Sequence, residues 1–463
     1  MQKRLDFMAK RRTLAVVLFL AAAHFSGAAA PSGEKDATSF FTLDNGLKVF
    51  LYARNTLPLV NIAACVNVGA KDETSGAGGL VHLLEHCILY RGTEFRSGAD
   101  VGRDIRRHGA YFNAHTGLDF SVFEISLPSE FAMFALENQK EILFDLSLSQ
   151  KELDEEKAVI LEEINEIQDD PVRSGTELVY QNLFKNHPYR NPLCGSLESV
   201  RAATVEQLEG FYKTYFVPEN CAVAVVGDFR LNEMEEKVRH VFEGVNKSGF
   251  APPAFEKAPL LGKAVVVEKE MDVGEGHVII GAVGPEYGHK DQYAVHVLSE
   301  ILGGGVNPLL NAALRARRDL VQRASMSYAA NRWGGVLLVH LVLAPGDRAP
   351  AVREALSFLK KVRNENFSPD DYFGDEKFYA FDFLRSAKNG IRFGAELAQE
   401  TGLDLARSLA MALLLRDENP SRGYMESILQ VTSSDLRKAA AKYLSGGEYV
   451  VATIMPVKDK RGR

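Results

Sequence analysis

The sequence lacks three features, and each shortage limits what the protein can be. After residue 30 it has no apolar run long enough to cross a bilayer, which takes about 20 residues. It has no excess of positive charge, because its formal net charge is −7, and this disfavours nucleic acid as a partner. It has only four cysteines, Cys65, Cys87, Cys194 and Cys221, which allow three full disulfide pairings that the sequence alone does not separate.

The first 30 residues differ from the rest and are typical of a secretory signal peptide. Basic side chains between positions 3 and 12 precede an apolar run at 13–23, and three alanines at 28–30 offer a cleavage site. An uncleaved anchor is the alternative, although the apolar run is short for a membrane span. We expect an exported chain, periplasmic or secreted, without a stable membrane span. Removing five basic and one acidic side chain moves the formal charge from −7 to −11.

The main functional signal is an H-x-x-E-H box made by His82, Glu85 and His86. In a helix the two histidines lie on one face, a turn apart, and can bind one metal ion. Glu85 lies over the same face, where it could take a proton from water. The alternative is a helix with two surface or capping histidines. The apolar neighbours at 80–89 argue against it, because buried imidazole and carboxylate groups need partners.

A catalytic zinc site needs three protein ligands and one open position, so a third ligand must come from elsewhere in the chain. Residues 152–168 are expected to form a long helix, and Glu156 and Glu163 share one of its faces because they are two turns apart. Most glutamates in such a run are solvated, but at least one of this pair could point inward. Cys87 is about 100° around the helix from His86 and is expected to point away from the metal.

These residues resemble the pitrilysin/mitochondrial-processing-peptidase family of zinc metallopeptidases, which is peptidase family M16 and has the inverzincin pattern. In that family 76 residues separate the H-x-x-E-H box from a glutamate ligand, and the same 76 residues, 87–162, separate His86 from Glu163. Glu156 matches a second glutamate that the family has seven residues earlier. The likeness covers roughly residues 38–456. Further matching segments are 43–47, 69–73, 90–93, 113–116 and 220–228.

The resemblance implies one Zn²⁺ per chain, held by His82, His86 and Glu163. It implies that Glu85 is the catalytic base, which takes a proton from water and passes it to the leaving amine. It also implies that Glu156 steadies His82 or His86 from outside the ligand set. The reaction expected from these roles is hydrolysis of peptide bonds.

The resemblance also implies substrate-binding residues in both halves of the chain. Asn113 and Ala114 match a strand that lies beside bound peptide, which would add to the sheet edge as a further strand; the alternative for Asn113 is a turn asparagine. Arg315 matches an arginine that family members use with a tyrosine seven residues later to hold the scissile carbonyl. Gln322 stands where the tyrosine should be, and this change is not neutral at an oxyanion site. Tyr328 is not expected to replace it.

Alternating strand and helix signals predict an α+β fold with two homologous domains, each a mainly antiparallel sheet packed by helices. The resemblance implies the same architecture, the LuxS/MPP-like metallohydrolase fold. We expect hairpin-like pairs, such as 47–53 with 61–68. The predicted divisions are a signal peptide (1–30), an N-terminal zinc-binding peptidase domain (31–247), a linker rich in proline and glycine (248–262), a C-terminal homologous domain without a metal site (263–457) and a basic tail (458–463).

A partial repeat of the metal box later in the sequence indicates an internal duplication. Residues 81–86, VHLLEH, resemble residues 295–300, VHVLSE, but the later copy has neither the base nor the second histidine. His296 is therefore expected to be a core or surface histidine and not a ligand.

Two such domains are expected to form half of a clamshell, so a partner chain is implied. The favoured partner is a homologous subunit that carries the arginine–tyrosine pair, and the alternative is a second copy of this chain. The function predicted is a zinc-dependent endopeptidase that acts on unfolded peptides. The alternatives are a non-catalytic scaffold of a processing complex and a subunit that binds peptides without cutting them. The presence of the whole metal set favours the enzyme.

Overall fold

The computed structural model describes residues 37–74, 77–259, 261–305, 308–364, 382–415 and 423–457. The expected signal peptide at 1–30 and the basic tail at 458–463 lie outside the described residues. Among the described residues, no helix combines the length and apolar character that a membrane span requires.

Six strands form the first sheet, in the order β1-β2-β6-β3-β5-β4. Neighbouring strands are antiparallel except for β2 and β6, which are parallel. The expected pairing of 47–53 with 61–68 is wrong, because β6 lies between β2 and β3 and pairs with both. All seven residues of β6 are buried, as suits an apolar strand at the centre of a sheet. The strand bounds are β1 Ala37–Thr42, β2 Lys48–Ala53, β3 Leu59–Val66, β4 Tyr111–Thr116, β5 Ser121–Pro128 and β6 Cys221–Gly227.

Five strands form the second sheet, in the order β7-β11-β8-β10-β9. The first pair is parallel and the others are antiparallel, which repeats the order and directions of β2-β6-β3-β5-β4. The two halves therefore share one topology, and the predicted α+β fold with two homologous domains is confirmed. The bounds are β7 Val265–Met271, β8 Gly276–Gly284, β9 Arg323–Ala329, β10 Gly335–Leu343 and β11 Val450–Pro456.

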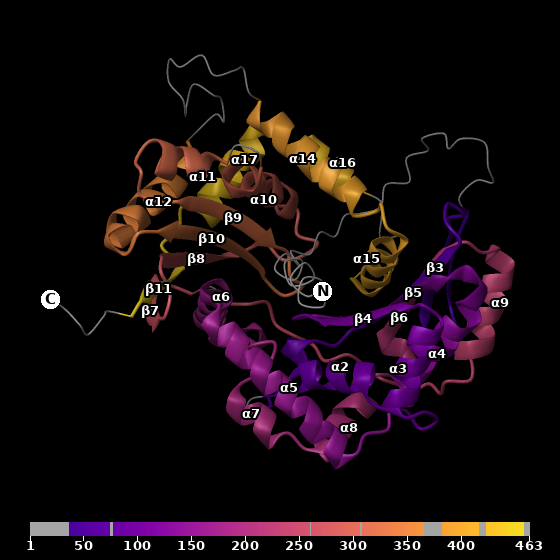
Figure 1. The fold of residues 1–463 in the computed structure, drawn as a ribbon. Helices are drawn as coiled ribbons and strands as arrows, with labels where there is room; N and C mark the ends of the chain where they lie inside the picture. Colours follow the sequence, from indigo (N-terminus) through magenta and orange to yellow (C-terminus); the bar gives the residue numbers. More distant parts are fainter. Residues whose placement is uncertain are drawn as a thin grey trace.

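Helices of each half cover one face of that half's own sheet (Figure 1). The helices of the first half are α2 Leu80–Tyr90, α3 Gly98–Arg107, α4 Ala132–Phe144, α5 Gln150–Asp169, α6 Pro171–Leu183, α7 Leu197–Ala202, α8 Val205–Tyr215 and α9 Leu231–Phe242. Those of the second half are α10 Gln292–Ser299, α11 Leu309–Asn311, α12 Arg348–Val362, α14 Phe383–Leu397, α15 Gly402–Leu415, α16 Tyr424–Gln430 and α17 Ser433–Tyr443. Short helical turns are η1 Ala70–Asp72, η2 Ser129–Phe131, η3 Pro188–Arg190, η4 Pro218–Asn220, η5 Glu300–Gly304, η6 Ala312–Ala316 and η7 Pro345–Asp347, of which η5 and η6 are π-helical.

The remaining face of each sheet is covered by a helix from the other half. Helix α6 packs on β8 and β11 of the second sheet, where Val179 lies against Gly281. Helix α15 packs on β3 and β6 of the first sheet, where Leu405 and Leu409 join one buried cluster with Ala63 (Figure 1). Separating the halves would expose both apolar faces, so this exchange fixes the two domains against each other.

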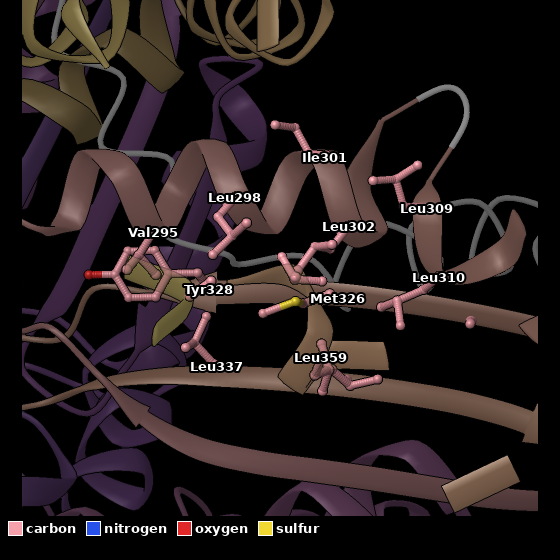
Figure 2. Packing of buried hydrophobic residues seen from close by; sticks show 14 of the residues in the cluster. Val295, Leu298, Ile301, Leu302, Leu309, Leu310, Met326, Tyr328, Leu337 and Leu359 are labelled. Atoms are coloured by element: carbon pink, nitrogen blue, oxygen red, sulfur yellow. The ribbon is translucent and has the colours of Figure 1, made fainter. Parts of the chain in front are cut away.

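Helix α10, which contains most of the partial repeat of the metal box, packs in the core of the second domain. Leu298 and Leu302 of α10 and η5 point toward Met326 and Tyr328 of the sheet below (Figure 2). His296 lies with its Nδ1 2.8 Å from the hydroxyl of Tyr424, and burial lowers the pKa of this imidazole to about 4. The structure thus gives His296 a hydrogen-bonded position inside the second domain.

Candidate metal centre

Helix α2 begins at a tight junction that the sequence analysis did not explain. Gly79 caps it in the left-handed region, at φ 87°, and a Cβ there would lie 2.5 Å from the Cys194 carbonyl oxygen. The buried Glu73 carboxylate accepts the backbone N–H groups of Gly79 at 3.0 Å and Val81 at 2.9 Å. Burial raises the pKa of Glu73 to about 8, although both N–H bonds oppose this. Glu73 therefore fixes the start of the helix that carries the H-x-x-E-H box.

Helix α5 is long and begins at a capping box, in which the Ser149 hydroxyl accepts the N–H of Glu152 and the Glu152 carboxylate accepts the N–H of Ser149. Its buried face packs on α2 through an apolar cluster that includes Leu83, Cys87 and Ile160. Cys87 belongs to this packing face and not to the face with the histidines. The cluster holds the two helices side by side, so that carboxylates of α5 lie next to the histidines of α2.

The two helices bring His82, His86 and Glu163 together. One ligand atom from each lies within 4.8 Å of the others, and no further group of this kind occurs among the residues that the structure describes. His82 Nε2 is 3.0 Å from Glu163 Oε2, and His86 Nε2 is 3.8 Å from Glu163 Oε1. Ligand atoms around one tetrahedral zinc are separated by about 3.3 Å, given bonds of about 2.0 to 2.1 Å. The donor set and its spacing therefore fit a zinc ion.

Glu85 lies beside this cluster with an oxygen that has no hydrogen-bond partner. Its side chain is buried, and Oε2 is 3.5 Å from His82 Nδ1, which is long for a hydrogen bond. The buried Thr116 hydroxyl of β4 faces this carboxylate and helps to lower its pKa. Burial alone would raise the pKa of Glu85, but the close polar contact with His82 and the positive charge of that imidazole lower it below its usual value. An ionised carboxylate with a free oxygen is suited to accept a proton.

Glu156 lies behind the cluster and contacts one of the two histidines. Its side chain is only 4% exposed, and its Oε2 is 3.1 Å from His86 Nδ1. Its Oε1 is 2.6 Å from Nη2 of Arg91, a residue to which the sequence analysis gave no role. Glu156 therefore has the position of an outer carboxylate that orients a ligand histidine.

The substrate residues expected in the first half lie on β4, the edge strand of its sheet. Ala114 is buried on the face toward α2. Because side chains alternate, Asn113 lies on the opposite face, where its amide donates to the Tyr111 hydroxyl at 3.2 Å. The outer backbone edge of β4 has no strand partner among the described residues.

Arg315 and Gln322 are not brought to the metal cluster within this chain. Arg315 lies in η6 and Gln322 directly before β9, and both side chains are exposed. Helix α11, which leads into η6, lies in the other half of the molecule from α2 and α5 (Figure 1). Tyr328 is buried and donates its hydroxyl to the Pro285 carbonyl at 2.6 Å. Tyr90 does lie near the cluster, since its half-exposed ring contacts the ring of His86 at 5.8 Å between centroids.

All four cysteines are buried free thiols. Cys65 lies in the cluster beneath α15, whereas Cys221 lies in the cluster on the opposite face of the same sheet. The structure therefore contains none of the disulfide pairings that the sequence left open.

Zinc and protons are expected to compete at His82. Burial alone would lower the pKa of His82, but its polar contacts with Cys194, Glu163 and Glu85 raise it well above the usual value. In the metal-free chain this imidazole therefore holds its proton more tightly than an ordinary histidine does, and metal binding must displace that proton. Zinc affinity should therefore fall about tenfold for each pH unit lowered below that pKa, since one proton is released. Competition with a chelating dye at several pH values measures this, and a constant affinity between about pH 8 and 6 would contradict it.

Both halves of the chain match descriptions of peptidase family M16. Residues 48–196 match the family described as "Insulinase (Peptidase family M16)", and residues 202–372 match "Peptidase M16 inactive domain". An uncharacterized zinc protease of Mycobacterium leprae (strain TN) is 25% identical over 424 residues, which are 91% of this chain and 92% of that protein. Zinc protease PqqE of Helicobacter pylori is 24% identical over 424 residues, which are 90% and 92% of the two chains.

Solved structures show the same fold. A protease from Helicobacter pylori superposes with a TM-score of 0.82 at 24% identity, covering 91% of this chain and 100% of that one. A peptidase M16 inactive domain from Pseudomonas fluorescens superposes with a TM-score of 0.79 at 18% identity, covering 91% and 98%. The metal cluster lies in the first matched region, and Arg315 and Gln322 lie in the second.

Proposed function

This chain belongs to peptidase family M16, and from that premise we propose that it is a zinc-dependent endopeptidase that hydrolyses unfolded peptides. The observation that carries the proposal is the convergence of His82, His86 and Glu163 around one point, with the unpartnered oxygen of Glu85 beside it. A scaffold or a peptide-binding subunit has no need of a buried carboxylate with one oxygen left without a hydrogen bond, which is costly to maintain.

The catalytic roles follow from the positions of the side chains. His82, His86 and Glu163 would hold the ion. A zinc ion in such a site supplies a Lewis acid that polarises the scissile carbonyl and makes water easier to deprotonate. Glu85 accepts the proton of the attacking water on its free Oε2 and then gives it to the leaving amine nitrogen. The low pKa of Glu85 keeps it ionised for the first of these steps.

Substrate binding is proposed at the outer edge of β4. An extended peptide added there would gain main-chain hydrogen bonds, which demand little of its sequence. The amide of Asn113 can both donate to and accept from such a peptide. Because only an extended chain can pair in this way, the site favours unfolded substrates.

A partner chain is proposed to complete the site. Arg315 lies in the opposite half of this chain from the metal cluster, so it would serve the metal centre of another chain. Gln322 can donate a hydrogen bond from its amide, but it lacks the phenol expected there. We favour a homologous subunit that carries the arginine–tyrosine pair, with a second copy of this chain as the alternative. Export to the periplasm or the medium is proposed from residues 1–30.

Cleavage of a short unstructured peptide tests the proposal. The chain without residues 1–30 would be loaded with zinc and assayed alone and with a homologous partner subunit. Hydrolysis should occur, disappear with a chelator and return with added zinc, while a stably folded protein stays intact. Zinc binding without hydrolysis in both assays would instead support a peptide-binding or scaffold role.

A further inference from the structure

Arg91, at the C-terminal end of α2, connects the metal helix to α5. Its Nη2 is 2.6 Å from Glu156 Oε1 and its Nη1 is 2.7 Å from Glu155 Oε2. The Arg91 side chain is 20% exposed, and its Nε is buried without a partner. The guanidinium therefore acts through its two terminal nitrogens, and both of these bind α5.

The contacts between α2 and α5 form three successive links. His82 contacts Glu163, His86 contacts Glu156, and Arg91 contacts Glu156 and Glu155. Positions rise along α2 while they fall along α5, so the helices are antiparallel. The middle link shares the Glu156 carboxylate with the third, because His86 and Arg91 each bind a different oxygen of it.

We propose that Arg91 is a positioning residue of the metal centre, which fixes the Glu156 carboxylate so that Glu156 in turn orients His86. This inference rests on the proposed function, since it assumes that His86 binds the ion. With Oε1 held by Arg91, the direction of Oε2 is fixed. The Nδ1–H of His86 donates to Oε2, which leaves the Nε2 lone pair free to bind the metal. Nε2 is the atom that faces Glu163, at 3.8 Å from its Oε1.

The electrostatics of the buried carboxylate explain why this link needs an arginine. Glu156 is 4% exposed, so its charge gains little from water and depends on the cation beside it. Glu155 is 47% exposed and needs no such partner. The forked guanidinium reaches both, but only its contact with Glu156 leads to a metal ligand.

The alternative is that Arg91 only ties the two helices together. The apolar cluster between α2 and α5, which includes Leu83, Ile160 and Ile164, holds them without any ion pair. A residue that only tied the two helices together would act through Glu155 as well as through Glu156, whereas a positioning residue acts through Glu156 alone. These differences separate positioning from tethering.

The test measures the zinc dissociation constant by competition with a chelating dye, without substrate. Arg91→Gln should weaken zinc binding about ten- to hundredfold, as is usual for partners outside the ligand set. Arg91→Lys, which keeps the charge, should recover most of that loss. In a Glu156→Gln background, Arg91→Gln should add no further loss, because its effect passes through Glu156.

Two variants serve as controls. Glu155→Gln removes the exposed partner of Arg91 and should leave zinc affinity unchanged. Arg96→Gln breaks the ion pair that a similarly exposed arginine makes with Glu141, outside the metal centre, and should also leave zinc affinity unchanged. Three results would overturn the proposal. They are an unchanged zinc affinity in Arg91→Gln, a full further loss of affinity when Arg91→Gln is added to Glu156→Gln, and an equal loss of affinity in Arg96→Gln. Failure of the peptidase proposal would appear differently, as zinc binding by the wild type without hydrolysis.

Discussion

Replacing Glu85 by glutamine is expected to abolish peptide hydrolysis while zinc remains bound. The amide has the shape of the carboxylate but cannot accept the proton of the attacking water. Oε2 of Glu85 makes no hydrogen bond and only a long contact, 3.5 Å, with His82 Nδ1, so the substitution should disturb the resting site little. General-base catalysis is worth about 10²- to 10⁴-fold, and kcat should fall by at least this factor. The measurements are kcat on an unstructured peptide and zinc content by elemental analysis.

The matched control for this variant is Glu94→Gln, which makes the same chemical change at an exposed glutamate just beyond α2. It should leave both kcat and zinc content unchanged. Hydrolysis at the wild-type rate by Glu85→Gln would exclude Glu85 as the base. Loss of zinc from Glu85→Gln would instead make it part of the ligand set.

The metal box could be predicted from the sequence because its geometry is local. His82, Glu85 and His86 lie within two turns of one helix, and helical periodicity alone places them on one side. Glu163 was harder to assign, because α5 contains many glutamates that the sequence alone does not distinguish. Its role as a ligand came only from the spacing that the resemblance supplied. The fold class was predictable for a similar reason, since strands and helices are encoded largely by local patterns.

The features that the sequence did not reveal all depend on contacts between distant segments. Arg91 stands in the motif that follows the box, but its partner Glu156 lies on another helix. The exchange of α6 and α15 between the two sheets leaves no local signal, because a helix that covers another domain's sheet has the same amphipathic pattern as one that covers its own. The insertion of β6 between β2 and β3 likewise depends on the whole sheet, and local alternation indicated a hairpin instead.

Replacing Glu163 by alanine is expected to remove zinc from the protein, and hydrolysis with it. Glu163 is the only carboxylate of the cluster, and it lies 3.0 Å from His82 and 3.8 Å from His86. Two histidines alone leave a catalytic zinc one protein ligand short. Losing partners outside a ligand set already costs about ten- to hundredfold in affinity, so losing a ligand should cost at least about a hundredfold. Elemental analysis after dialysis, and the zinc dissociation constant, measure the effect.

The neighbouring Glu162 provides the control for this variant, because it is exposed on the same helix and lies one residue away. Glu162→Ala should keep full zinc occupancy and activity. The Glu163 side chain is itself 40% exposed, so its truncation should leave the fold intact, and an unchanged circular dichroism spectrum would verify this. Full zinc occupancy in Glu163→Ala would refute its role as a ligand. The two substitutions then separate the functions of the site: Glu85→Gln loses hydrolysis and keeps the ion, whereas Glu163→Ala loses both, because a base acts only after the ligands have placed the ion beside it.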